Sequence, residues 1–152
     1  MVNPDGFYDR EDKYNANGIN LNRNFYSDYW SSYSNDDPTW YGGTGPFSEA
    51  ESRVIKDVVE GCNTKLMIAY HSQGYLVIPE HQTESEELAA WYAEKTGYDY
   101  FDDWDFHGTA TGWFTETTGY PSITVELTNH MASDWQINRE ALFEIVSKEY
   151  DF

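Results

Sequence analysis

The chain has 152 residues, which suits one domain with a sizeable buried core. Nine lysines and arginines stand against 27 aspartates and glutamates, which gives a formal net charge of −18. Such a surface repels the phosphates of nucleic acids and of anionic lipids, so both classes of partner are excluded. The sequence also contains no apolar stretch long enough for a membrane-spanning helix.

Cysteine and aromatic content leave some questions open. Cys62 is the single cysteine, so no internal disulfide can form and the redox compartment stays open. Aromatic residues make up 18% of the chain, and several crowd residues 29–41 without any helical or strand period. Because aromatic and acidic side chains together also suit sugars, a carbohydrate-binding protein is kept among the alternatives.

The first long element along the chain is a loop over residues 26–47, rich in Ser, Asp, Gly and aromatic residues. Loops of this length without regular structure are usually functional or disordered. Disordered segments are poor in aromatic residues, so the composition favours a folded lid or pocket wall.

Three helices are predicted from capping boxes, in which a Ser or Thr is followed three residues later by Glu or Gln. The boxes begin at Ser48, Thr83 and Ser133, and each is followed by apolar residues at helical spacing. Gly61 and Gly97 are expected to end the first two helices, since glycine adopts the left-handed conformation found at helix ends.

Apolar runs of strand length lie between these helices, at residues 66–70, 75–78 and 123–127. Hydrophobic strands that alternate with helices are typical of an α/β fold, with helices on both faces of a mixed, largely parallel sheet. Ligands in such sheets bind beyond the carboxyl ends of the strands. His71 follows the first run directly, and Glu126 lies near the end of the third. We therefore expect one pocket to hold both side chains.

These polar residues are placed where a packed core favours apolar ones. A histidine and a carboxylate in buried strands are costly unless they bind a metal or carry out acid–base chemistry. Each alone also has an ordinary explanation, His71 as a hydrogen-bonded core residue and Glu126 as an ion-pair partner. Upstream, Asn22 and Arg23 provide a fork suited to a carboxylate. Together the four residues favour a peptidase site.

The order of four motifs resembles that of the zinc carboxypeptidases, and the resemblance runs along nearly the whole chain. The motifs are NPDG at 3–6, GINLNRNF at 18–25, IAYHSQG at 68–74 and ITVELT at 123–128. Four ordered motifs are far more specific than any one of them.

The resemblance implies a role for each matching residue. His71 would be the last of three zinc ligands, and Glu126 the general base that activates the metal-bound water. Asn22 and Arg23 would hold the terminal carboxylate of the substrate. Lys13 stands where the family has an arginine that stabilises the oxyanion, and a lysine would supply that charge as a point donor. A solvated loop lysine is the plain alternative for Lys13.

Two further family positions fall in the later part of the chain. Thr111 lies near the position that floors the specificity pocket, and a small neutral residue gives no support for a charged side-chain preference. The ordinary alternative is that residues 108–113 form a glycine-rich turn leading into a strand. The tyrosine that covers bound substrate has no secure match: its place falls near Trp104, with Tyr98 and Tyr100 as candidates.

A zinc peptidase needs three protein ligands and one open position. The resemblance places the first two ligands in a His-x-x-Glu motif several tens of residues before NPDG, and no such motif precedes NPDG in this sequence. A His-x-x-Glu does occur at 81–84, but it follows His71, and Thr83 within it is explained as a helix cap. His107 and His130 have no ligand spacing and are expected on the surface or a pocket wall.

We therefore expect residues 1–152 to form a single partial peptidase domain that lacks the N-terminal third and two zinc ligands. The expected reaction is hydrolysis of a peptide bond next to a free C-terminal carboxylate. The HSQG segment at 71–74 is similar to bacterial members that cleave γ-D-glutamyl–diamino acid bonds, so the substrate is a peptide or a cell-wall peptide. A non-catalytic binding module is the main alternative. A secreted or cell-envelope location is favoured over a cytoplasmic one.

Overall fold

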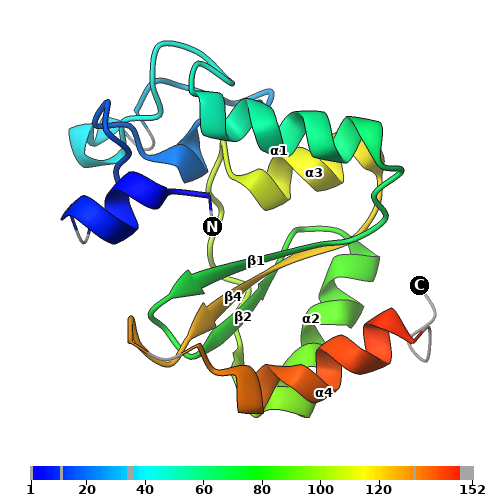
Figure 1. Ribbon diagram of the computed structural model, residues 1–152. Coiled ribbons are helices and arrows are strands. Elements are labelled where there is room, and N and C mark those ends of the chain that lie inside the picture. Colours follow the sequence, from blue (N-terminus) through cyan, green and yellow to red (C-terminus); the bar gives the residue numbers. More distant parts are fainter. Residues whose placement is uncertain (1, 11, 34–35, 132, 148–152) are drawn as a thin grey trace. The chain divides into compact units, whose positions relative to one another are not determined.

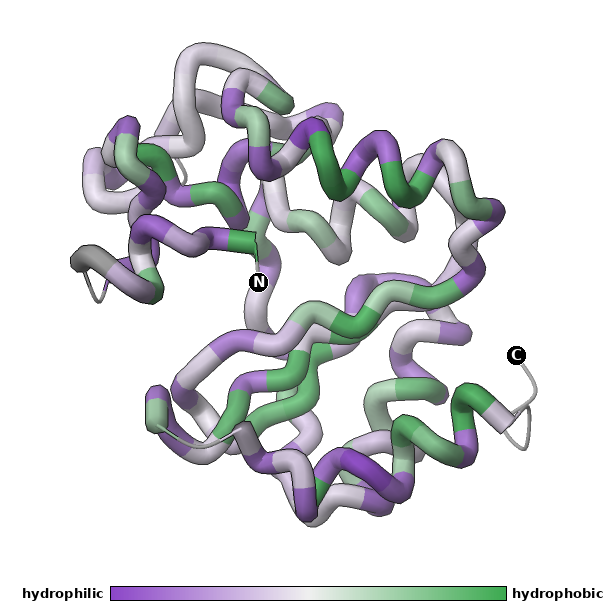
Figure 2. The backbone as a smooth tube through the Cα atoms, viewed as in Figure 1, coloured by the Kyte–Doolittle hydropathy of each residue, from purple (hydrophilic) through white to green (hydrophobic). Residues whose placement is uncertain are grey.

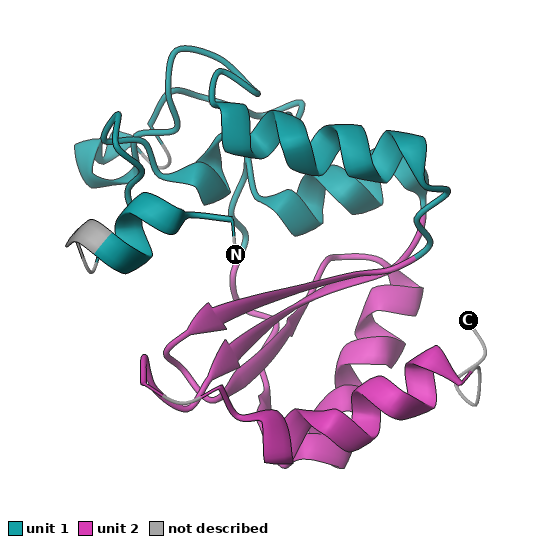
Figure 3. Ribbon diagram, viewed as in Figure 1, with its two compact units in different colours: residues 1–65, 105–119 teal, residues 66–104, 120–152 magenta. Residues whose placement is uncertain are grey.

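A computed structural model describes residues 2–10, 12–33, 36–131 and 133–147 (Figure 1). The chain divides into two compact units, each assembled from two separate stretches of sequence (Figure 3). The first unit comprises residues 1–65 and 105–119, and the second comprises residues 66–104 and 120–152. The expectation of one partial domain over 1–152 stays a prediction.

The second unit is built on a four-stranded sheet in the order β1-β4-β2-β3. β1 (Met67–Ser72) runs parallel to β4 (Ser122–Leu127), and β2 (Leu76–Pro79) runs parallel to β3 (Asp99–Tyr100). β2 and β4 pair antiparallel. The predicted α/β class with a mixed, largely parallel sheet is confirmed. β3 has two exposed residues and no apolar run, so the sequence pattern does not reveal it.

The hydrophobic core of this unit lies between the sheet and two helices, α2 (Thr83–Thr96) and α4 (Trp135–Val146). Both helices pack on the same face of the sheet, and hydrophobic residues run along β1, β2 and β4 (Figure 2). The buried core residues are Val77, Leu88, Ala89, Tyr92, Ala93, Tyr98, Ile123, Val125 and Ala141. Full burial of a side chain such as Leu88 contributes about 1.5–3 kcal/mol.

The ends of α2 follow the predicted signals with one correction. Gly97 adopts the left-handed conformation (φ 76°) and ends the helix, as expected. The helix begins at Thr83, and Gln82 rather than Thr83 is its cap, because the Gln82 side chain accepts a hydrogen bond from the backbone N–H of Ser85 at 3.1 Å.

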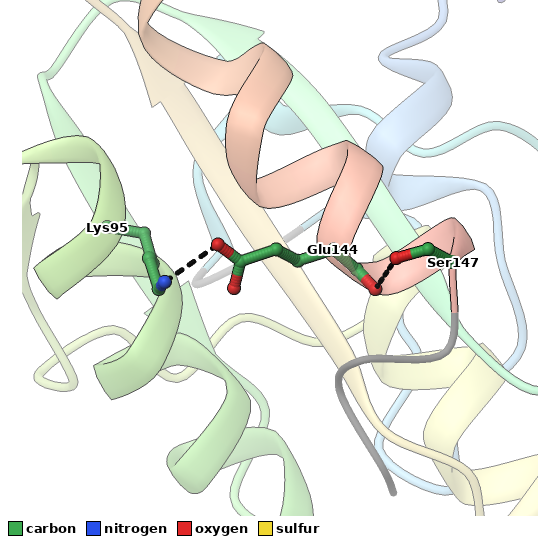
Figure 4. A network of polar contacts seen from close by, with 3 residues as sticks. All are labelled: Lys95, Glu144 and Ser147. Carbon is green, nitrogen blue, oxygen red and sulfur yellow. Dashed lines mark hydrogen bonds and ion pairs between the residues drawn. The ribbon is translucent and has the colours of Figure 1, made fainter.

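An ion pair joins α2 and α4 (Figure 4). Lys95 Nζ lies 2.7 Å from Glu144 Oε1, and Ser147 Oγ donates to the backbone oxygen of Glu144 at 3.1 Å. The hydrogen bond to Glu144 raises the pKa of Lys95. Solvent screens the pair, so it contributes much less to stability than the core does.

A chain of polar contacts crosses this otherwise apolar core. The hydroxyl oxygens of Tyr70 and Tyr92 lie 2.6 Å apart, and Tyr92 donates to Asn138 Oδ1 at 2.7 Å. Asn138 Nδ2 donates to the Tyr98 hydroxyl at 3.0 Å, and Tyr98 donates to Asp134 Oδ2 at 2.8 Å. Burial raises the pKa of Tyr92 and of Tyr98. Both therefore remain neutral donors within the network.

The first unit has less regular structure. Its described residues include α1 (Ala50–Gly61), α3 (Ala110–Thr118), short 3₁₀ turns at Leu21–Arg23 and Pro38–Trp40, and a π-helical segment at Gly6–Arg10. The first predicted helix is confirmed as α1, although Glu49 occupies its cap position without a side-chain cap bond. The loop over 26–47 is largely irregular, as expected, and its role as a lid or wall stays a prediction.

α3 corrects the alternative that residues 108–113 lead into a strand. Thr109 caps the helix, because its hydroxyl accepts a hydrogen bond from the N–H of Gly112 at 3.0 Å. Gly119 ends it in the left-handed conformation with φ 73°. No Glu or Gln follows Thr109 at the third position, so the capping-box pattern does not reveal this helix.

Asn24 organises the loops of the first unit and is fully buried. Its Nδ2 donates to the carbonyl oxygen of Gly42 at 2.6 Å and to Ser48 Oγ at 2.8 Å. Its Oδ1 accepts from Ser52 Oγ at 2.6 Å and from the N–H of Glu49 at 3.1 Å. One side chain thus ties the loop to the start of α1.

Candidate functional site

His71 and Glu126 are neighbours on the sheet of the second unit. They are register partners in the parallel pair β1–β4, where adjacent strands lie about 4.8 Å apart. Leu76 of β2 pairs with Glu126 from its other side. Side chains alternate between the faces of a strand, so these three lie on the face opposite to the one that packs on α2 and α4. His71 lies within β1 rather than beyond its end.

The surroundings of Glu126 favour a carboxyl group that can take up a proton. The side chain is half-buried, and burial raises its pKa above the ordinary value. Gly74 leaves room for it, because a Cβ at position 74 would lie 3.0 Å from Glu126 Cβ. The ion pairs among the described residues are Lys56–Glu60 and Lys95–Glu144, so they give no support to Glu126 as an ion-pair partner.

The other histidines do not assemble around His71. His130 Nδ1 lies 2.8 Å from Ser72 Oγ, and His81 and His107 are exposed. No group of three or more His, Cys, Asp or Glu that could hold a metal occurs among residues 2–10, 12–33, 36–131 and 133–147. A zinc site needs three protein ligands. The described residues therefore do not complete one.

Arg23 dominates the predicted site residues of the first unit. Its side chain is only 5% exposed, and burial lowers its pKa to about 10, so it stays charged at neutral pH. Nη1 donates to the backbone oxygen of Asn22 at 2.5 Å. Nε is buried and has no hydrogen-bond partner among the described residues. A buried guanidinium with an unfilled donor is suited to an anionic oxygen.

Two aromatic rings flank this guanidinium. Its Cζ lies 4.8 Å from the ring centroid of Trp40 and 4.5 Å from that of Phe106. The two rings stack on each other with centroids 5.6 Å apart and planes 20° apart. Lys13 Nζ lies 4.0 Å from the centroid of the Trp40 ring. One indole thus contacts two cations by cation–π interaction.

Asn22 and Thr111 connect the same region to α3. The Asn22 Oδ1 accepts a hydrogen bond from the N–H of Ala110 at 2.9 Å, at the first residue of the helix. Thr111 lies in the first turn of α3 and is 1% exposed. The contact with Ala110 fixes the orientation of the Asn22 amide, with its nitrogen end pointing away from the α3 backbone N–H.

The candidates for a substrate-covering tyrosine differ in the exposed fraction of their side chains. Tyr98 is 3% exposed, and its hydroxyl is held by Asp134 and Asn138, so it cannot swing over a ligand. Tyr100 and Trp104 are 39% and 40% exposed. Tyr100 is therefore the more exposed of the two candidate tyrosines, and its role stays a prediction.

The structure thus presents the predicted residues as two groups. Lys13, Asn22, Arg23 and Thr111 belong to the first unit, and His71 and Glu126 belong to the second. Their convergence on one pocket stays a prediction. Neither Trp40 nor Phe106 stands in a motif that links it to the Arg23 site. The only signal for Trp40 is the aperiodic cluster of aromatic residues in the 26–47 loop.

Comparison with known proteins places these groups in context. The model of a family described as zinc carboxypeptidase matches residues 1–145. The chain is 27% identical to gamma-D-glutamyl-L-diamino acid endopeptidase 1 of Lysinibacillus sphaericus, over 76% of this chain and 31% of that protein. The chain therefore spans about a third of the length of this curated relative.

Solved structures share the fold. Murein-tripeptide amidase MpaA from Escherichia coli O157 matches with a TM-score of 0.69 and 21% identity, over 97% of this chain and 64% of that one. Carboxypeptidase A from Helicoverpa armigera matches with a TM-score of 0.69 and 23% identity, over 95% of this chain and 47% of that one. Among the described residues, no helix is both long enough and apolar enough to cross a membrane.

Proposed function

This chain belongs to the zinc carboxypeptidase family, and we propose that the protein containing it hydrolyses a peptide bond next to a free C-terminal carboxylate. The observation that carries the proposal is the register pair of His71 and Glu126, on the sheet face away from α2 and α4, with the pKa of Glu126 raised by burial. A carboxylate with a raised pKa takes a proton from water more readily than an ordinary one does.

In this proposal Glu126 is the general base and His71 is one zinc ligand. Zinc, when bound, lowers the pKa of a coordinated water to about 7. The described residues do not complete a metal site, so the proposal requires two further ligands from outside them. Half-burial among the sheet residues restricts the positions that the Glu126 side chain can adopt.

Arg23 and Asn22 bind the substrate carboxylate in the same proposal. The unfilled Nε of Arg23 supplies a charge-assisted donor, and burial strengthens that interaction because water competes less. Lys13 supplies a second positive charge, which suits an oxyanion that develops during hydrolysis. Thr111 is proposed as part of the floor of the specificity pocket.

The proposed substrate class is a peptide, with cell-wall peptides as the favoured members. Support comes from the names of two similar proteins, an endopeptidase that acts on a γ-D-glutamyl–diamino acid bond and an amidase that acts on a murein tripeptide. A secreted or cell-envelope location is proposed together with this substrate, because that is where cell-wall peptides are met.

A second candidate function is a binding module that holds peptide carboxylates without catalysis. It is favoured by the content of the first unit, which includes Arg23, Asn22 and Lys13 and contains neither His71 nor Glu126. Such a module would bind free-acid peptides and leave them uncleaved.

One assay tests the carboxylate grip directly. Full-length wild-type protein and Arg23→Ala are compared on one peptide in free-acid and C-terminal amide forms. We expect Arg23→Ala to lose far more kcat/KM on the acid than on the amide, because the charge-assisted donor is gone. The exposed Arg139→Ala on α4 is the matched control. If Arg23→Ala keeps the wild-type preference for the acid over the amide, the proposal that Arg23 binds the substrate carboxylate is rejected. Binding of the acid without cleavage would favour the module.

A further inference from the structure

Trp40 is in contact with both positive charges of the first-unit site. We propose that Trp40 is a positioning residue, which holds the Lys13 ammonium and the Arg23 guanidinium against one ring so that both act on a single anionic ligand. The inference rests on the proposed function, in which Arg23 binds a carboxylate. It adds the residue that holds the two cations together.

The geometry places the two charges against one indole ring. Lys13 Nζ lies 4.0 Å and Arg23 Cζ 4.8 Å from the centroid of the same indole ring. The charges are therefore at most about 9 Å apart, the sum of those two distances, and they repel each other. An aromatic ring attracts a cation through its negative face, so it holds both charges and offsets part of that repulsion.

No carboxylate of a described residue forms an ion pair with either charge. The ion pairs of the described residues include neither Lys13 nor Arg23, although the chain carries 27 acidic side chains. The carboxylate of Asp37 accepts a hydrogen bond from the backbone N–H of Thr39 at 2.9 Å, and this contact lowers the pKa of Asp37 more than the charge of Lys13 does. An aromatic ring keeps a cation in place without cancelling its charge. The charge then stays available to a ligand.

The ring itself is fixed in its position. Trp40 ends a 3₁₀ turn that begins at Pro38 and has Asp37 as its cap. The backbone N–H of Trp40 donates to the backbone carbonyl oxygen of Asp37 at 3.0 Å. Phe106 stacks on its ring and contacts the Arg23 guanidinium from a different stretch of chain. A ring that is stacked on Phe106 limits where the two cationic side chains that contact it can lie. This is the property expected of a positioning residue.

The experiment measures binding, so it does not depend on turnover. Calorimetry gives the Kd of one N-acetylated peptide, as free acid and as amide, for full-length wild type, Trp40→Leu and Trp40→Phe. We expect Trp40→Leu to weaken binding of the acid about tenfold and of the amide about twofold or less. Trp40→Phe keeps a ring face and should retain most of the affinity. Trp91→Leu is the matched control, because that ring lies 5.8 Å from Lys95 in the second unit.

A double-mutant cycle separates positioning from a merely structural role. In an Arg23→Ala background, Trp40→Leu should weaken binding of the acid by no more than about twofold, since one of the two cations that it positions is gone and the pair can no longer act together. Three results would overturn the inference: equal losses for acid and amide, an undiminished tenfold loss in the Arg23→Ala background, or a loss for Trp40→Phe as large as for Trp40→Leu. Failure of the proposed function looks different, because wild type would then bind acid and amide equally.

Discussion

The two units bury different kinds of side chain. The buried residues of the second unit are mostly apolar, and its sheet and helices are regular. The first unit buries a larger set of polar and charged side chains on irregular backbone. These residues are Asn15, Asn20, Arg23, Asn24, Ser27, Glu49, Ser52, Thr109 and Thr111.

The difference shows two ways of holding a functional group in place. In the second unit, strand register sets the positions of His71 and Glu126, and the apolar core holds the strands. In the first unit, the loop backbone has few ladder partners, so side-chain amides and hydroxyls satisfy its polar groups instead. Buried side-chain hydrogen bonds define a loop as firmly as register defines a sheet, provided that every partner is present.

The largest expected effect tests which unit carries the chemistry. In the full-length protein, Glu126→Gln should reduce hydrolysis by about 10²–10⁴-fold, because the amide keeps the shape of the side chain and removes the base. Glu116→Gln in the first unit is the matched control, since the pKa of Glu116 is also raised by burial. Retention of most activity by Glu126→Gln, or an equal loss in the control, would contradict the role of Glu126.

The next effect measures the apolar core of the second unit. Leu88 is fully buried, and Leu88→Ala should lower the free energy of unfolding by about 2–5 kcal/mol through lost burial and the cavity left behind. Urea unfolding gives the value. The exposed Val146→Ala on α4 should cost much less. Equal costs for the two variants would show that this core does not stabilise the unit.

Asn24→Ala measures how much the buried side-chain hydrogen bonds stabilise the first unit. The substitution removes the hydrogen bonds that Asn24 makes with Gly42, Ser48, Ser52 and Glu49, so we expect a loss of about 2–3 kcal/mol in the free energy of unfolding. Exposed Asn129→Ala is the control and should cost well under 1 kcal/mol. If Asn24→Ala unfolds at the same urea concentration as wild type, the loops are held by something else.

The smallest effect concerns pH. The pKa of Glu126 is raised in the folded chain, so the folded state binds more protons than the unfolded one, and stability falls as pH rises above about 4.5. Glu126→Gln removes this dependence. The variant should therefore be more stable than wild type at pH 7, and the difference should shrink toward pH 4. Thermal unfolding of the metal-free chain at both pH values measures the stability difference between the variant and wild type. A difference that grows toward pH 4 would contradict the raised pKa of Glu126.

The same contrast explains which features the sequence could predict. β1, β2 and β4 are rich in apolar residues, with Glu126 interrupting the run of β4, so their existence and their order between helices follow from the pattern. β3 pairs at only two positions, Leu76–Asp99 and Val77–Tyr100, and is defined by its neighbour rather than by its own residues. The register of His71 with Glu126 is likewise a property of two strands, and composition does not set it.

The first-unit site was only half accessible to sequence reasoning. Asn22 and Arg23 stand together in a motif, so they could be named as a carboxylate fork. Trp40 and Phe106 are 66 positions apart in the sequence and meet only through the fold. Tyr98, a candidate cover for substrate, proved to be a core residue because its hydroxyl is bonded to groups on α4 and at its start.

Each unit is assembled from two separate stretches of sequence, and this arrangement limits when the chain can fold during its synthesis. The first unit requires residues 105–119, and the second requires residues 120–152, so neither is complete when the first hundred residues have left the ribosome. β1 meets its partner β4 only after about fifty further residues have emerged, and pairing across such a separation is slow. During that delay the apolar strand is exposed, and a chain released early would carry an unpaired, aggregation-prone edge.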